Sequence, residues 1–248
     1  MWGIIPAAGT GSRIQPLAFS KELLPVGSFV TESGERPRAV SEYLIERMVS
    51  AGAEKICFVI SRGKSDILDY FGGSAFSAKI FYAVQEHPNG LCDAIFTALP
   101  LIPCEENVCI GLPDTIWLPE SGLCDLPCDG LSLLLFPVDH PERFDAVVTS
   151  DAGEVKEVQV KSNQARTEWV WGAMKMPAAV LHTLYQIWLE RQDEYLGTLI
   201  NEYLRRGGRA LGVRIGEAYV DVGTVHGYRE ALRLLDRSRT LAAACISR

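Results

Sequence analysis

The opening segment of the chain limits most strongly how it can fold. A short apolar run, Ile4-Ile5, leads into the loop Pro6-Ala7-Ala8-Gly9-Thr10-Gly11-Ser12-Arg13, and Lys21 follows soon after. Glycine tolerates positive φ and lets a backbone approach a ligand closely, so such a loop can present its N–H groups to an anion. Arginine adds a bidentate fork, and lysine adds a mobile point charge. The segment therefore predicts the first strand of an α/β domain that binds a polyphosphate.

Apolar runs alternate with amphipathic stretches along the first half of the chain, which predicts a mostly parallel sheet with helices on both faces. We expect the strands at 2–7, 56–61, 78–83 and 107–111, and the helices at 40–51, 64–71 and 92–101. In such sheets, ligands bind beyond the C-terminal ends of the strands. The loop 9–13 and Asp114, which follows the fourth strand, should therefore lie at the same edge.

The second half of the chain is less regular. We expect its strands at 131–138, 146–149, 155–160 and 169–176, its helices at 178–191 and 196–206, a last strand pair at 211–215 and 218–222, and a closing helix at 227–237. The turn Asp151-Ala152-Gly153 indicates that the strands on either side of it form a hairpin.

Composition and charge exclude several classes of function. The formal net charge is −7, which disfavours broad attraction to nucleic acid or to an anionic membrane. The chain has no apolar run of about 18 residues, and its N-terminus resembles a core strand rather than a leader. We therefore expect no nucleic-acid or membrane partner and a cytoplasmic location. The seven cysteines lack the spacing of a secreted scaffold, which indicates reduced thiols.

Two well-known glycine loops do not fit the opening segment. A P-loop requires Lys-Ser or Lys-Thr directly after its last glycine, whereas Ser12-Arg13 follows Gly11. A dinucleotide fingerprint requires a third glycine where Ile14 stands, which disfavours an oxidoreductase. The segment instead resembles the signature of the sugar nucleotidyltransferases. That signature is a glycine-rich loop ending in Gly-(Thr/Ser)-Arg, then (Pro/Ser)-Lys-(Glu/Gln)-Leu-Leu-Pro-Val, here Ser20-Lys21-Glu22-Leu23-Leu24-Pro25-Val26.

Further motifs follow in the chain order of this family. The segment 85–95 resembles the base-recognising segment, in which the Gln85 amide and the Gly90 backbone would meet the nucleobase. Gly111-Leu112-Pro113-Asp114 and Tyr219-Val220-Asp221-Val222-Gly223-Thr224 resemble the segments that supply metal-binding aspartates, here Asp114 and Asp221. Two carboxylates together with phosphate oxygens and water form a hard oxygen site that suits Mg²⁺.

The resemblance extends to the acceptor side, with two departures. Lys161 matches the family lysine that contacts the sugar phosphate, and Gly172 matches the glycine that lets the acceptor lie against the backbone. Val160 replaces the glutamate that usually grips sugar hydroxyls, and Asp145 stands where the family usually has glycine. Both departures fall in the expected acceptor pocket and bear on the identity of the acceptor.

The resemblance implies a Rossmann-like α/β nucleotidyltransferase fold with a small inserted β lobe on the substrate side. It implies one domain over 1–248, with a nucleotide-binding core at 1–138 and an acceptor-binding part with the closing helix at 139–237. It further implies Mg²⁺-dependent transfer from a nucleoside triphosphate, with dTTP or UTP favoured, to a sugar 1-phosphate. Arg13 and Lys21 would be catalytic, and the loop residues would bind substrate: Ala8, Gly9, Thr10 and Gly11.

Two alternative functions stay open at this point, as does association with a second copy of the chain. The acceptor could be a non-sugar phosphate such as an amino-alcohol phosphate, since an acidic residue at position 145 would favour a cation. The chain could instead be a catalytically silent relative that binds a nucleotide sugar and regulates a partner, although it keeps Arg13, Lys21, Asp114 and Asp221. Family members commonly form oligomers, so a second copy of the chain remains open as a partner.

Overall fold

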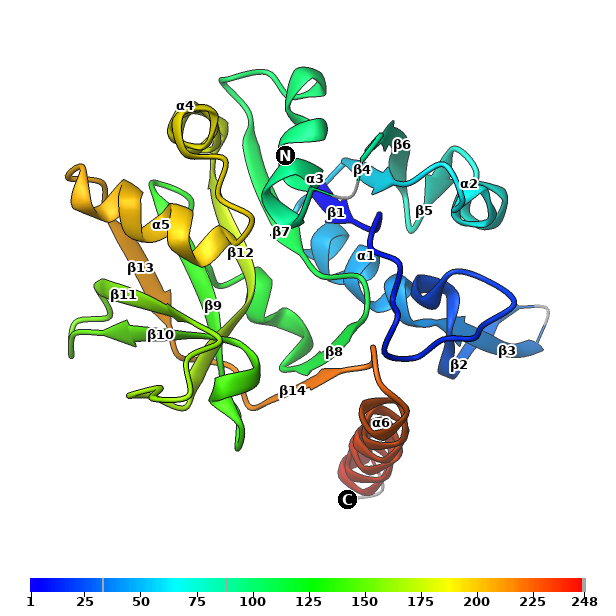
Figure 1. Cartoon of the computed structure of the whole chain (residues 1–248). Coiled ribbons are helices and arrows are strands. Elements are labelled where there is room, and N and C mark those ends of the chain that lie inside the picture. Colours follow the sequence, from blue (N-terminus) through cyan, green and yellow to red (C-terminus); the bar gives the residue numbers. More distant parts are fainter. Residues whose placement is uncertain (33, 88, 247–248) are drawn as a thin grey trace.

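The computed structural model describes residues 1–32, 34–87 and 89–246, and it contains one large mixed sheet covered by helices on both faces (Figure 1). The strands of its parallel part are β1 (Trp2–Pro6), β4 (Lys55–Ile60), β6 (Ala78–Val84) and β7 (Asn107–Gly111). β1 pairs in parallel with both β4 and β7, and β4 pairs in parallel with β6. These are the four strands predicted for the first half, and their carboxyl ends share one edge.

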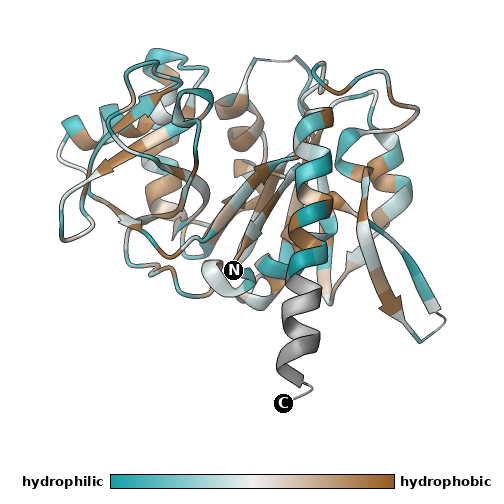
Figure 2. Ribbon diagram, turned by 90° about the horizontal axis from the view of Figure 1, so that it is seen from below, coloured by the Kyte–Doolittle hydropathy of each residue, from teal (hydrophilic) through white to brown (hydrophobic). Residues whose placement is uncertain are grey.

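Two apolar clusters explain why this sheet is covered on both faces. Successive residues of a strand point to opposite faces, so Ile4 belongs to one cluster and Ile5 to the other. The cluster around Ile4 packs α3, α4 and α5 onto one face, and the cluster around Ile5 packs α1 and α2 onto the other. The bounds of these helices are α1 (Val40–Ser50), α2 (Ser65–Phe71), α3 (Leu91–Thr97), α4 (Ala178–Arg191) and α5 (Leu196–Arg205). Figure 2 shows hydrophobic residues concentrated on the central strands, between the helices.

The second half of the chain makes the sheet mixed. β12 runs antiparallel to both β7 and β9, and the predicted hairpin of β10 and β11 is confirmed. The bounds are β9 (Leu131–Pro137), β10 (Asp145–Thr149), β11 (Val155–Val160), β12 (Trp169–Pro177) and β13 (Ala210–Val213). The β lobe that we predicted on the substrate side corresponds to β10 and β11. The two strands extend the large sheet at its edge, because β10 also pairs with β12.

The last two strands do not pair with each other, contrary to expectation. β13 joins β9 in parallel, whereas β14 (Ala218–Asp221) pairs antiparallel with β8 (Thr115–Leu118) in a separate sheet. Nearness in sequence favoured a local pair, but both strands found partners about 80 to 100 residues earlier in the chain, as only the tertiary structure reveals. In Figure 1, β8 and β14 lie between the two halves of the molecule.

Other elements also differ from the sequence expectation. β2 (Pro25–Thr31) and β3 (Gly34–Ala39) form a separate hairpin that was not predicted, because its prolines and glycines are typical of a loop. A short strand, β5 (Ser74–Ala75), pairs antiparallel with β6. The closing helix α6 (Val225–Ile246) begins earlier and ends later than predicted.

Helix α6 returns to the N-terminal half of the chain. Ala231 and Leu235 of α6 join a third apolar cluster with Val26 of β2 and with Val40 and Tyr43 of α1. This contact places the end of β14, directly before α6, against the segment that carries the opening motif.

Within the part of the chain that the structure describes, no helix is both long and apolar enough to cross a membrane.

A side-chain amide holds α5 against the outermost strand of the sheet. Asn201 Oδ1 accepts from the backbone N–H of Val158 at 2.8 Å, and Asn201 Nδ2 donates to the carbonyl oxygen of Val158 at 2.7 Å. Val158 lies on β11, which has a neighbouring strand on one side only. The amide therefore replaces a missing backbone partner, and it fixes the strand that leads to Lys161.

We predict that Asn201→Leu destabilises the fold by roughly 2 kcal/mol, because a buried N–H and a buried carbonyl lose their partners together. Urea denaturation followed by circular dichroism measures the change. Thr183→Val on α4 is the control, since it removes an exposed hydroxyl that bonds only to Ala179 O, and its effect should stay within about 0.5 kcal/mol. Equal unfolding midpoints for the two variants would contradict the prediction.

Candidate active site

The predicted catalytic cations and metal-binding carboxylates meet at the C-terminal edge of the parallel strands. Lys21 Nζ lies 2.5 Å from Asp114 Oδ2, and Arg13 Nη1 lies 2.9 Å from Asp221 Oδ2. Asp221 is the last residue of β14. Val222 follows it and donates its N–H to the carbonyl oxygen of Asp114 at 2.8 Å, which brings Asp221 to this edge. Two motifs more than 100 residues apart in sequence thus form one cluster.

Gly223 shows how closely this cluster converges. A Cβ atom at this position would lie 2.8 Å from Asp221 Oδ1, 3.1 Å from Arg13 Nη2 and 3.3 Å from Asp114 Oδ2. The Gly223 N–H also donates to Asp221 Oδ1 at 2.8 Å. Both carboxylates and the guanidinium therefore face one small space that a side chain at position 223 would fill.

The side chains of Lys21 and Arg13 differ in exposure and therefore in conformational freedom. The exposed fraction of the side chain is 14% for Lys21 and 63% for Arg13. Burial by itself would lower the pKa of Lys21, but the adjacent Asp114 outweighs this effect and the pKa is raised, with smaller contributions from Glu22 and Asp221. Lys21 is therefore a fixed positive charge throughout the neutral range, whereas Arg13 can reorient toward a ligand.

The carboxylate pair fits a magnesium ion that shares its coordination with a substrate. Among the described residues, no group of three or more His, Cys, Asp or Glu side chains is arranged to hold a metal. Asp114 and Asp221 supply oxygen ligands only, and Mg²⁺ commonly binds through one or two carboxylates while phosphates and water complete its shell. The donor set is therefore compatible with the predicted Mg²⁺ and poor for zinc, which prefers nitrogen and sulfur ligands.

The glycine loop packs against Lys21, the predicted catalytic lysine. Gly11 has a φ of +66°, and a Cβ there would lie 2.7 Å from Lys21 Cδ, so glycine is required both for conformation and for space. Ala8 is buried, whereas Gly9 and Thr10 are exposed, and a Cβ at Gly9 would meet no atom within 4 Å. The outer part of the loop therefore borders open space, as a phosphate-binding loop requires.

Hydrogen bonds between its own residues hold the predicted base-recognising segment. Gln85 is buried, and its Nε2 donates to Asp93 Oδ2 at 2.6 Å and to the Gly90 carbonyl oxygen at 3.2 Å. Gly90 has a φ of +94° and lies against Glu194, whose Cγ would be 2.6 Å from a Cβ at Gly90. Both amide protons of Gln85 thus hold the segment in shape. Pro88 of this motif lies outside the described residues.

The acceptor-side residues lie along β10 and β11. Asp145 stands directly opposite Val160 in the hairpin, and its Oδ2 would lie 3.1 Å from a Cβ at Gly197 of α5. Burial raises the pKa of the Asp145 carboxyl, partly opposed by the Trp171 indole and the Lys161 ammonium. The hairpin therefore carries a carboxylate at the position opposite the one where the family motif has glutamate.

Lys161 and Gly172 each have a structural role that the motifs did not reveal. Lys161 adopts a φ of +42°, and its Nζ lies 4.6 Å from the centre of the Tyr195 ring, within cation–π range. A Cβ at Gly172 would lie 2.6 Å from the Tyr219 ring and 2.7 Å from the Phe136 ring. Gly172 therefore lets Tyr219, two residues before Asp221, pack against the sheet.

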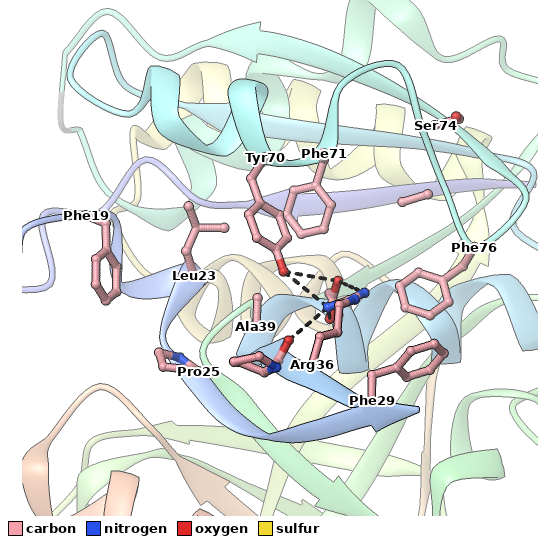
Figure 3. Close-up of a pocket in the computed structure, with 13 residues that line it drawn as sticks. Phe19, Leu23, Pro25, Phe29, Arg36, Ala39, Tyr70, Phe71, Ser74 and Phe76 are labelled. Atoms are coloured by element: carbon pink, nitrogen blue, oxygen red, sulfur yellow. Dashed lines mark hydrogen bonds and ion pairs between the residues drawn. The ribbon is translucent and has the colours of Figure 1, made fainter. Parts of the chain in front are cut away.

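Of two hollows in the structure, one borders the site. One of about 740 Å³ opens beside Arg13 and Asp221 and is also lined by Phe144 and Tyr219. Another, of about 860 Å³, lies between α2 and the β2–β3 hairpin, and Figure 3 shows its aromatic rings together with Arg36 and Tyr70. None of the predicted site residues lines this second hollow, and its Arg36 and Tyr70 side chains both bond to Glu42.

Side chains that no sequence motif predicted support the site from below. Lys64 Nζ donates to both carboxylate oxygens of Glu22, at 2.7 and 2.8 Å, and to the carbonyl oxygen of Ala7 at 2.6 Å. Ser20 donates from its N–H and its hydroxyl to Asp66, at 2.6 and 2.7 Å. The glutamate next to Lys21 was visible in the motif, but its partner on a different element was not.

Comparisons with known proteins identify the family of the chain. The model of the nucleotidyl transferase family matches residues 2–238. The UTP–glucose-1-phosphate uridylyltransferase AglF of Haloferax volcanii is 27% identical over 252 residues, covering 98% of this chain and 99% of AglF. A glucose-1-phosphate thymidylyltransferase of Neisseria meningitidis is 27% identical over 263 residues, covering 99% of this chain and 87% of that protein.

A solved structure shows that the fold is shared. The UTP-bound UGPase of Acinetobacter baumannii matches with a TM-score of 0.75 at 21% identity, covering 94% of this chain and 92% of that chain. The Rossmann-like nucleotidyltransferase fold expected from the motifs is therefore confirmed. Because the family model spans nearly the whole sequence, from the glycine loop to the closing helix, this protein belongs to the nucleotidyl transferase family and is a nucleotidyltransferase.

Proposed function

We propose that the protein transfers a nucleotidyl group from dTTP or UTP to a sugar 1-phosphate, giving a nucleotide sugar and pyrophosphate. The observation that carries this proposal is the convergence of Lys21, Asp114, Arg13 and Asp221 around Gly223, beside the glycine loop. The names of the uridylyltransferase and thymidylyltransferase relatives support the choice of substrates.

The chemistry asks for alignment and charge compensation rather than for a base. An oxygen of the acceptor phosphate attacks the α-phosphorus, the bond between that phosphorus and the bridging oxygen breaks, and pyrophosphate leaves with the bond electrons. A phosphate nucleophile is already anionic near neutral pH, so no proton has to be removed. The barrier arises from repulsion between anions and from the need for in-line geometry, which fixed cations relieve.

The two cations would divide this work. Lys21 is held at the mouth of the glycine loop and stays charged, so it would stabilise the negative charge where the α-phosphate meets the acceptor. Arg13 is largely exposed and offers a bidentate fork, so it would follow the leaving phosphates. Asp114 and Asp221 would hold Mg²⁺, which supplies Lewis-acid polarisation of the phosphates when it is bound.

A second candidate acceptor is a phosphate that carries a positive charge, such as an amino-alcohol phosphate. The observation in its favour is Asp145, a partly buried carboxylate on the acceptor-side hairpin, opposite the apolar Val160. A carboxylate can accept hydrogen bonds from sugar hydroxyls, but it is also a partner for an ammonium group. The two acceptors therefore place different demands on Asp145.

Pyrophosphate release tests the proposed reaction directly. The purified protein is incubated with Mg²⁺, one nucleoside triphosphate and one acceptor, over a panel of sugar 1-phosphates and amino-alcohol phosphates. We expect release only with dTTP or UTP together with a sugar 1-phosphate, and loss of release when EDTA removes the metal. Release with an amino-alcohol phosphate as the acceptor, and with none of the sugar 1-phosphates, would instead identify the second candidate as the acceptor.

Asp145→Asn separates the two acceptors further, because it removes the charge and keeps the shape. For a cationic acceptor we expect KM to rise roughly tenfold, the value of one charge-assisted contact. For a sugar 1-phosphate we expect both kcat and KM to stay within about threefold of the wild-type values, since the amide oxygen of asparagine can still accept a hydrogen bond from a sugar hydroxyl. Initial rates at varied acceptor concentration measure both constants.

Lys21→Met tests the catalytic lysine, because methionine keeps the aliphatic contact with Gly11 and removes the charge. We expect kcat to fall by roughly 100- to 1,000-fold, as for the loss of one preorganised transition-state contact. Lys79→Met on the exposed side of β6 is the control and should keep the wild-type rate. A folded Lys21→Met variant with undiminished kcat would remove Lys21 from the mechanism.

A further inference from the structure

A buried ion pair lies beneath the proposed catalytic lysine. The exposed fraction of the side chain is 9% for Lys64 and 1% for Glu22. All three protons of the Lys64 ammonium have acceptors in the protein, namely the two Glu22 oxygens and the carbonyl oxygen of Ala7. Lys64 therefore has no proton left for a substrate phosphate, and its effect on the reaction must pass through its neighbours.

We infer that Lys64 and Glu22 are positioning residues that fix Lys21 and the glycine loop relative to each other. This inference rests on the proposed function, because it assumes that Lys21 acts on the phosphates. Ala7 directly follows β1 at the start of the glycine loop, and its N–H still pairs with the Val59 carbonyl oxygen of β4 at 2.8 Å. Lys64 thus links the root of the loop to the residue that follows Lys21.

The start of α2 holds the catalytic turn on both sides of Lys21. The turn is a short 3₁₀ helix, Lys21–Leu23. Lys64 is the residue directly before α2, and Asp66 is the second residue of that helix. Lys64 binds the residue after Lys21, and Asp66 binds Ser20, the residue before it, through two hydrogen bonds. With both neighbours fixed, the backbone at Lys21 is held at a place from which its side chain reaches Asp114.

Helix α1 completes this arrangement from a third element. The hydroxyl of Ser41 donates to the carbonyl oxygen of Glu22 at 2.7 Å, so the backbone and the side chain of Glu22 are held by different helices. Glu22 belongs to the turn of Lys21, and Ala7 directly follows the strand that carries the loop. Loss of the Lys64 contacts would therefore leave the turn and the start of the loop free to move relative to each other.

Stability alone does not account for charges at this place. An apolar pair of similar volume is often as stable as a buried ion pair, because desolvation offsets the attraction between the charges. Hydrogen bonds, in contrast, have direction, and Lys64 directs three of them to two separate segments. The pair is therefore suited to fixing geometry, which is what an in-line transfer between phosphates requires.

The test is the double variant Glu22→Gln with Lys64→Met, which removes both buried charges and leaves neither one unpaired. We expect it to fold and to lose roughly 100-fold in kcat, the effect of a displacement of about 1 Å in a catalytic group. The KM for the triphosphate should change much less. Rates are measured at a temperature where circular dichroism shows the variant fully folded, so a purely structural role would leave kcat unchanged.

Two controls separate position from stability. Lys55→Met breaks the ion pair between Lys55 and Glu106 at the opposite end of β4, and it should leave kcat within about twofold. Glu22→Gln alone keeps an oxygen acceptor for Lys64 but leaves the ammonium without its counter-charge, and we expect it to lose about tenfold in kcat. Where the double variant does not fold, this single variant decides the matter, with rates measured at a temperature where circular dichroism shows it folded.

Combining the pair substitutions with Lys21→Met distinguishes failure of this inference from failure of the proposed function. If the pair acts through Lys21, adding Glu22→Gln and Lys64→Met to Lys21→Met should lower kcat far less than it does in the wild type. Full additivity, or wild-type kcat in the folded pair variants, would overturn the inference while the proposed function stands. Lack of pyrophosphate release by the wild type, or full activity of Lys21→Met, would instead overturn the proposed function.

Discussion

Parallel pairing of β1 with β4 on one side and β7 on the other is the constraint on which the site depends. It brings three strand ends to one edge of the sheet, so the glycine loop, the start of α2 and Asp114 become neighbours. Each strand is buried on both faces, which makes the register of these ends hard to shift without exposing apolar residues. Loops at such an edge can vary in sequence while their roots stay fixed.

Opposite charges are concentrated at this edge in a chain whose net charge is −7. Lys21 and Arg13 each pair with one carboxylate, and a further Lys–Glu pair lies directly beneath them. Long-range attraction would not draw an anionic substrate to such a protein, so recognition has to come from short contacts. The contacts that we propose for it are the backbone of the glycine loop, the ammonium of Lys21 and the exposed guanidinium of Arg13, which lie within one small region.

Much of the fold and the site could be predicted, because the signals were local. The strands that begin at Trp2 and Asn107 and the helix that begins at Val40 followed from apolar periodicity, and the loop residue Gly11 proved to require glycine. The hairpin β2–β3 escaped prediction because its prolines and glycines resemble a loop. The partners of β13 and β14 escaped it because strand pairing across about 100 residues leaves no mark in either segment.

By itself, the sequence determined the family, the strand and helix pattern of the first half, and the residue types available for chemistry. It did so because periodicity and short motifs are properties of neighbouring residues. Only the tertiary structure decided that Arg13 pairs with Asp221, that Asp145 faces Val160 across the hairpin, and that Lys64 reaches Glu22 and Ala7. These contacts join segments far apart in the chain, and they form only when burial of the apolar faces of the sheet brings the segments together.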